Sequence, residues 1–225
     1  MTTSGTSNFN LEFDDIIVEA YERCGIEVRD GYDMKTALRS INLLFAEWAN
    51  RGLNLWTIEQ RQVLLSTGVY EYELPTDTVD ALSAVIRTNA GMTTQQDITI
   101  DRIGYAEYLH IPNKSTQSRP AQYFVQRTAP AKLFLYPAPD ATQQYIFRYY
   151  AIRRIQDAGT FTNTADISFR FLPCLVAGVS YYLSVKKAPD RVQLLKAMYD
   201  EEFARAAAED RERSGYFAVP MYQAR

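Results

Sequence analysis

Residues 33–52, DMKTALRSINLLFAEWANRG, decide the fold because a helix and its end lie together in this stretch. Its apolar side chains recur at spacings of three and four residues, which puts them on one face of an α-helix. That stripe consists of Met34, Ala37, Leu38, Ile41, Leu44, Phe45 and Trp48. Gly52 is a typical helix-ending residue, and the pattern changes directly after it. The stretch therefore predicts a helix over residues 33–50 and a different architecture beyond it.

A second helical stripe precedes this one. Residues 11–24, LEFDDIIVEAYERC, place their apolar side chains on one face, with Asn10 as the expected N-cap and Gly25 as the expected stop. The linker between the two predicted helices is short, which favours an antiparallel helical hairpin.

Two more helices are predicted near the other end of the chain. One covers about residues 172–186, with Pro173 in its first turn, where proline is tolerated. The other begins at Pro189 and ends near Gly215, because proline suits a first helical position and glycine a helix end. The chain therefore predicts about four helices.

Between Leu53 and Ile155 the helical period gives way to short runs typical of strands, broken by Pro, Gly and Asn. Six or seven strands are expected, in the runs 63–65, 69–74, 79–87, 97–103, 122–126, 132–136 and 145–152. Thr67-Gly68 predicts a bend or hairpin, and the stretch around Asn89-Ala90-Gly91 predicts a hairpin. A brief helical turn is expected over residues 104–109, before a polar loop.

These elements predict an α+β fold. A helical bundle forms from residues 1–52 and 160–215, and an antiparallel β-rich region, residues 53–159, is inserted between its halves. Residues 216–225, YFAVPMYQAR, follow as an extended C-terminal tail without periodicity.

Charge and composition exclude several classes of protein. The 225 residues include 24 Lys and Arg and 27 Asp and Glu, which give a net charge of −3. We therefore do not expect strong binding to DNA phosphates. No apolar run approaches the ~20 residues that span a membrane, and residues 1–10 do not resemble a secretory signal. We expect a soluble protein of a reducing cytoplasm, with Cys24 and Cys174 as buried apolar side chains.

Few residues are suited to catalysis. His110, the single histidine, precedes Ile111-Pro112 and is predicted to be a loop or surface residue, since triads and multi-histidine metal sites need partners. The pairs Asp14-Asp15 and Glu201-Glu202 are predicted to be solvated helix surface, because neighbouring helical positions point in different directions. No phosphate-binding or nucleophile motif is present in the sequence. We predict a protein that is not an enzyme and needs no metal or cofactor.

Other features favour contact between chains. The 16 tyrosines are unusual, and aromatic side chains are enriched at protein interfaces. Trp56 is predicted to pack in the core where the β region begins, with a subunit contact as the alternative. An apolar terminal segment predicts a docking site, either on its own domain or, as we favour, on another chain. The docking residues in the tail are Tyr216, Phe217, Val219, Pro220, Met221 and Tyr222.

Several short motifs occur in a characteristic order between about residues 11 and 215. They are residues 37–56 (ALRSINLLFAEWANRGLNLW), Leu74-Pro75 with Val79-Asp80, 111–114 (IPNK), 119–123 (RPAQY), 135–140 (LYPAPD), 170–173 (RFLP), 187–189 (KAP) and 208–213 (AEDRER). In this order they resemble the head-to-tail adaptor proteins of short-tailed bacteriophages.

The resemblance implies a virion structural protein at the head–tail junction, assembled in the host cytoplasm. Such adaptors form a homo-oligomeric ring of twelve copies that binds the portal protein through a C-terminal arm and a tail or nozzle protein at its other end. DNA passes through the lumen without sequence-specific binding, and the ring helps to retain it. Candidate subunit or tail contacts are Trp56, Tyr108, His110, Asn113 and Lys114.

Two alternatives stay open from the sequence alone. The first is a stopper or tail-tube component of the virion, which would lie further from the capsid. The second, more distant, is a cell-wall hydrolase that uses two carboxylates, for which Asp14, Asp15, Glu201 and Glu202 are the candidates.

Overall fold

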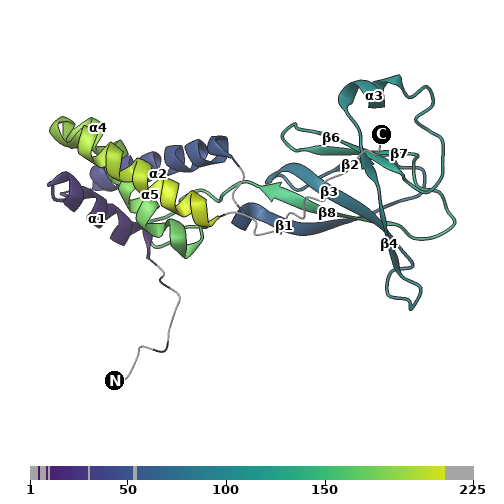
Figure 1. Ribbon diagram of the computed structural model, residues 1–225, viewed down its shortest axis with the longest axis horizontal. Coiled ribbons are helices and arrows are strands. Elements are labelled where there is room, and N and C mark those ends of the chain that lie inside the picture. Colours follow the sequence, from purple (N-terminus) through teal and green to yellow (C-terminus); the bar gives the residue numbers. More distant parts are fainter. Residues whose placement is uncertain (1–4, 6–8, 10, 30, 53–54, 211–225) are drawn as a thin grey trace, which may run out of the picture. The chain divides into compact units, whose positions relative to one another are not determined.

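The computed structural model describes residues 5, 9, 11–29, 31–52 and 55–210. These residues form two compact units (Figure 1). The helical unit contains the chain up to Trp48 and from Asp157 onward, and the β unit contains Ala49–Gln156. The predicted tail, residues 216–225, lies outside the described residues, as does Gly215.

Four main helices build the helical unit, as the sequence predicts. They are α1 (Phe13–Cys24), α2 (Gly31–Arg51), α4 (Leu172–Lys187) and α5 (Val192–Glu209), with short 3-10 turns η2 (Phe169–Phe171) and η3 (Pro189–Arg191) before the last two. Pro189 therefore begins a 3-10 turn in place of the α-helix itself. The helix α5 ends at Glu209, six residues before the predicted stop.

Aromatic rings fill the centre of this unit. The ring of Trp48 lies 5.9 Å from that of Phe45, 5.6 Å from Phe171 and 6.3 Å from Phe203, measured between centroids. Its Nε1–H donates a hydrogen bond of 2.9 Å to the Tyr199 hydroxyl. A buried indole nitrogen thus has a partner, so the cluster combines apolar burial with a satisfied polar group.

The two N-terminal helices bury most of the side chains that their sequence periods predict. In α1 the buried stripe is Phe13, Ile16, Ile17, Ala20, Tyr21 and Cys24. In α2, Met34 and Leu38 are only half-buried, whereas Asp33 and Ser40 are buried. The polar pair is buried because Lys187 Nζ bonds Asp33 Oδ1 and Lys186 Nζ bonds Ser40 Oγ, both at 2.8 Å. Hydrogen-bonded partners make such burial tolerable.

The two ends of α1 show where local signals succeed and where they fail. Gly25 ends the helix in the left-handed conformation, with φ of 73°, as predicted. At the start, the N-cap is Glu12 and not Asn10, and Glu12 makes no side-chain capping bond. The N–H of Phe13 bonds the Asn163 carbonyl at 3.0 Å instead. A segment distant in the sequence therefore caps α1.

The β unit consists of two four-stranded sheets. The first has the order β1 (Ile58–Leu64), β8 (Ile146–Arg153), β3 (Thr78–Thr88) and β4 (Gln96–Thr99). The second has the order β2 (Glu71–Glu73), β7 (Lys132–Tyr136), β6 (Gln122–Gln126) and β5 (Asp101–Arg102). One buried cluster takes side chains from both sheets, and the rings of Tyr123 (β6) and Phe147 (β8) lie 5.5 Å apart within it. The two sheets thus pack as a small sandwich.

Strand pairing follows the prediction in one hairpin and departs from it elsewhere. The predicted hairpin around Asn89 is confirmed, since β3 and β4 pair antiparallel. Thr67-Gly68 forms a bend, not a hairpin, because β1 pairs with β8 while β2 pairs with β7. The expected antiparallel arrangement is wrong for β5 and β6, which are parallel. A crossover containing the short helix α3 (Tyr105–His110) joins these two strands, as a parallel pair requires.

Candidate interaction surfaces

The short helix α3 is anchored by one side chain and exposes two others. The ring of Tyr108 is 8% exposed and lies 5.8 Å from Phe124 of β6 and 5.3 Å from Phe134 of β7. Tyr105 and Leu109 are 65% and 59% exposed. We call Tyr105, Leu109 and the exposed His110 the α3 patch. Tyr105 and Leu109 are four residues apart and therefore share a helix face. This spacing is visible in the sequence and could have indicated the patch.

The loop after α3 uses two predicted contact residues to hold its own shape. Lys114 Nζ donates hydrogen bonds to the carbonyls of Ile111 at 3.1 Å and Leu109 at 3.4 Å, and it lies 5.3 Å from the centroid of the Tyr108 ring. Asn113 Oδ1 accepts a bond of 3.0 Å from the N–H of Ser115. These contacts cap α3 and shape a turn, so Lys114 and Asn113 support the α3 patch.

Trp56 and the α3 patch lie against different sheets of the β unit. It lies half-buried in η1 (Leu55–Thr57), which packs against β8 of the first sheet, whereas α3 packs against β6 of the second. Of the predicted contact residues, the structure brings Tyr108 and Lys114 into direct contact and leaves Trp56 elsewhere in the β unit. The tail residues Tyr216 to Tyr222 lie outside the described part of the chain.

The paired carboxylates occupy helix surfaces. Asp15 is exposed and Asp14 half-buried on the first turn of α1. Arg205 pairs with both Glu201 and Glu202 on α5, the second through Nη1 and Oε1 at 3.1 Å. Ion pairing on an exposed helix face fits the interpretation of these residues as solvated surface.

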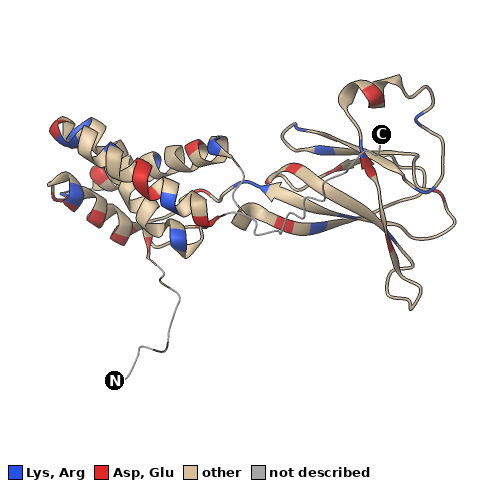
Figure 2. Cartoon of the chain, in the orientation of Figure 1, with Lys and Arg blue, Asp and Glu red and all other residues tan. Residues whose placement is uncertain are grey.

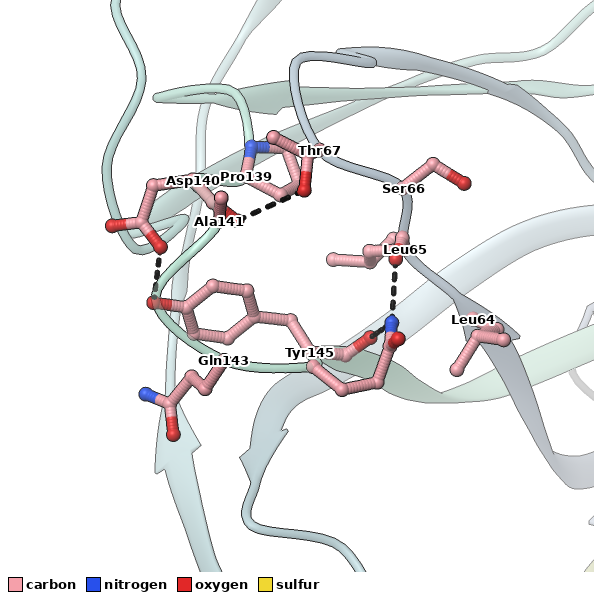
Figure 3. A pocket seen from close by; sticks show the side chains of 10 residues that line it. Leu64, Leu65, Ser66, Thr67, Pro139, Asp140, Ala141, Gln143 and Tyr145 are labelled. Carbon is pink, nitrogen blue, oxygen red and sulfur yellow. Dashed lines mark hydrogen bonds between the residues drawn. The ribbon is translucent and has the colours of Figure 1, made fainter.

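A hollow of about 460 Å³ in the β unit is lined by the bend after β1 and the loop before β8 (Figure 3). In it the Tyr145 hydroxyl donates to Asp140 Oδ1 at 3.1 Å, and the Thr67 hydroxyl donates to the Asp140 carbonyl at 3.3 Å. Hydrogen bonds from the Thr142 side chain and backbone lower the pKa of Asp140. The carboxylate is thus held in its charged form by contacts within its own loop and is poorly suited to donate a proton, whereas the backbone carbonyl of Asp140 joins this loop to the bend after β1.

A second groove, of about 560 Å³, lies within the helical unit between α1 and the first turns of α4. Its apolar lining includes Leu11, Ile16, Leu172, Pro173 and Val176, and three charged side chains of α1, Asp15, Glu19 and Arg23, also line it. Local sequence reasoning missed this groove because the two helices that form it are about 150 residues apart in the chain.

Charges of both signs are interspersed over the residues drawn in colour in Figure 2. Several arginines of the β unit have acidic partners. Arg61 bonds Asp77 at 2.7 Å, and this bond lowers the pKa of the Asp77 carboxyl. Arg102 bonds the buried Asp80 at 2.8 Å. In the described residues, no group of three or more His, Cys, Asp or Glu is placed to hold a metal ion, and no helix is long and apolar enough to cross a membrane.

Comparison with known families identifies the protein class. Residues 13–222 match the family described as SU10 adaptor protein, a match that begins at the first residue of α1 and runs beyond α5, through both units. The chain belongs to the SU10 adaptor protein family. The members of this family are phage head–tail adaptors, so the resemblance seen in the motifs is confirmed. A search of curated proteins found no match.

Membership of the SU10 adaptor family also bears on the alternatives. It is a family of structural adaptors and not of enzymes, so a carboxylate-dependent hydrolase has no support from it. The role that follows from membership is that of a virion adaptor. The surfaces of the SU10 adaptor chain are accordingly best considered as sites of contact with other virion proteins.

Proposed function

We propose that this chain is one subunit of a twelve-membered ring that joins the portal to the tail, surrounds the DNA channel and helps to retain packaged DNA. The observation that carries this proposal is the family match over residues 13–222, because it includes both the helical unit and the β unit. A match to one unit alone would show only that this unit is similar to part of an adaptor.

The exposed apolar side chains of both units support assembly. A closed ring with more than two subunits needs two different patches on each subunit. Leu43, Val185 and Leu194 are 58%, 58% and 63% exposed in the helical unit, and the α3 patch lies in the β unit. We propose that such patches meet neighbouring subunits or the tail protein, with Tyr108, Asn113 and Lys114 holding the α3 patch in shape.

The charge of the chain supports a passage for DNA. A net charge of −3 leaves little attraction for phosphates, and arginines such as Arg61 and Arg102 already have acidic partners. A channel wall of this kind allows DNA to slide, because few cations on it would bind the backbone.

The apolar tail supports attachment to the portal. Tyr216, Phe217, Val219, Pro220, Met221 and Tyr222 are the proposed anchors. Each buried aromatic anchor is worth ~2 kcal/mol or more, and repetition around a ring multiplies weak contacts into a durable joint. We propose that subunits remain monomeric until an assembled portal binds the tail.

The test measures the mass of the purified chain by light scattering, alone and with portal rings. We expect a monomer alone and a twelve-subunit addition with the portal. Removing residues 215–225 should abolish attachment and leave the circular dichroism spectrum unchanged, whereas Gln223→Ala, the matched control, should attach normally. A stable ring without the portal would contradict portal-templated assembly, and attachment of the truncated chain would contradict the role of the tail.

A further inference from the structure

The groove between α1 and α4 has apolar lining residues and a charged rim on which two acidic side chains stand against one basic side chain. Leu172 and Pro173 at the start of α4 and Leu11, just before α1, are its accessible apolar residues, and Asp15, Glu19 and Arg23 of α1 border it. Glu19 is bonded to Arg23 at 2.8 Å, whereas the Asp15 carboxylate has no ion pair within the described residues. The helix α1 as a whole carries four acidic residues and one basic residue. A ligand with apolar side chains and positive charge fits this surface.

The last helix, α5, ends beside this groove. Arg170 Nη1 donates a hydrogen bond of 3.2 Å to the carbonyl of Glu209, the last residue of α5. Arg170 lies only two residues before Leu172, which lines the groove. The chain therefore leaves α5 next to the first turn of α4.

Residues 211–225 have the composition that the groove requires. The sequence RERSGYFAVPMYQAR contains three arginines and one glutamate, together with Tyr, Phe, Val and Met side chains. Fifteen residues reach about 50 Å when extended, which exceeds the ~24 Å length of a 16-residue helix such as α4. Residues 1–10, MTTSGTSNFN, carry no basic side chain that could pair with Asp15.

From these observations we propose that residues 211–225 dock in the α1–α4 groove of their own subunit when the subunit is unassembled. The apolar side chains of the segment cover Leu11, Leu172 and Pro173, and its arginines face Asp15. This docking requires neither portal nor ring, so its test is independent of the proposed function. It would shield the apolar tail until a competing surface displaces it.

Cysteine cross-linking in the full chain tests the docking. The pair Asp15→Cys and Val219→Cys should form an intramolecular disulfide at least tenfold faster than Asp200→Cys with Val219→Cys. Asp200 is an exposed acidic residue of α5, within the ~30 Å that an extended segment up to Val219 reaches, so it is a matched control. The native Cys24 and Cys174 are buried and will react little.

The second test measures how the cross-linking rate depends on charge. Arg211→Glu with Arg213→Glu in the cross-linking background should slow the reaction several-fold, and 0.5 M salt should have a similar effect on the unmodified segment. Equal rates for the Asp15 and Asp200 pairs would overturn the proposal. Disulfides formed only between chains would assign the segment to a second copy, and faster cross-linking of Asp15→Cys to Ser7→Cys than to Val219→Cys would assign the groove to the N-terminal segment; either result would also overturn it.

Discussion

Two buried tyrosines differ in what their hydroxyl groups contact. In the helical unit, the Tyr199 hydroxyl accepts from Trp48 Nε1 at 2.9 Å and donates to Glu47 Oε2 at 3.2 Å. In the β unit, the buried Tyr108 hydroxyl has no hydrogen-bond partner among the described residues. We therefore expect the same substitution to have different effects on stability at the two positions.

We expect Tyr199→Phe to destabilise the protein by about 1–3 kcal/mol, because it removes the acceptor of a buried indole N–H. Tyr108→Phe should leave the stability unchanged or raise it by up to about 1 kcal/mol, since it removes a buried polar group without a partner. Urea unfolding followed by tryptophan fluorescence measures both changes. Equal losses at the two positions would contradict the hydrogen-bond assignments.

The ion pair between Lys187 and Asp33 predicts a pH dependence. A hydrogen bond of 2.8 Å from Lys187 Nζ lowers the pKa of Asp33, so the folded state favours the charged carboxylate. The resulting stabilisation is present above the ordinary Asp pKa of about 3.9 and is lost as the pH falls below it.

We therefore expect Asp33→Asn to lower the free energy of unfolding at pH 7, and the difference from the wild type to shrink between pH 5 and pH 3. Denaturant titrations at several pH values measure this difference. Asp200→Asn, at an exposed position, is the control and should have little effect. A difference that does not vary with pH would mean that the lost stabilisation is not that of the charged pair.

At the scale of elements, three helices meet at Gly178. A Cβ atom added at this position in α4 would lie 2.7 Å from Leu44 Cδ2 of α2 and 3.0 Å from Tyr199 Cε2 of α5. Such distances are too short for ordinary contact, so close packing of the helices depends on the missing side chain.

We expect Gly178→Ala to destabilise the helical unit by about 1–3 kcal/mol through overpacking, partly offset by ~1 kcal/mol from the higher helix propensity of alanine. Leu44→Ala creates space, so the double variant should lose less stability than the sum of the single losses. Gly31→Ala, where no atom lies within 4 Å of the added Cβ, is the control. Additive losses at Gly178 and Leu44 would show that the two positions do not compete for space.

At the scale of the whole molecule, the charge distribution predicts behaviour toward DNA. The full chain should bind duplex DNA with a dissociation constant weaker than about 0.1 mM near physiological salt, because its arginines are balanced by acids. Fluorescence anisotropy of a labelled duplex measures the binding. Asp97→Lys removes the acidic partner of Arg87 and Arg148 and should strengthen the binding. Tight binding by the unmodified chain would contradict a channel wall along which DNA slides.

The sequence by itself determined the type and approximate position of nearly every element. The stripe in α1, the stop at Gly25, the hairpin of β3 and β4 and the turn of α3 all follow from signals within a few residues. Local backbone sterics and side-chain periodicity are enough for these features, because helices bury every third or fourth residue and strands every second. The family resemblance likewise depended on the order of short motifs, and the family match confirms it.

Only the tertiary structure decided which distant segments meet. It pairs β1 with β8, makes β5 parallel to β6, caps α1 with the Asn163 carbonyl and buries Asp33 beside Lys187. It also forms the groove between α1 and α4. The physical reason is that each of these contacts is selected by the surface that two remote segments bury together, and no local pattern encodes the choice of partner.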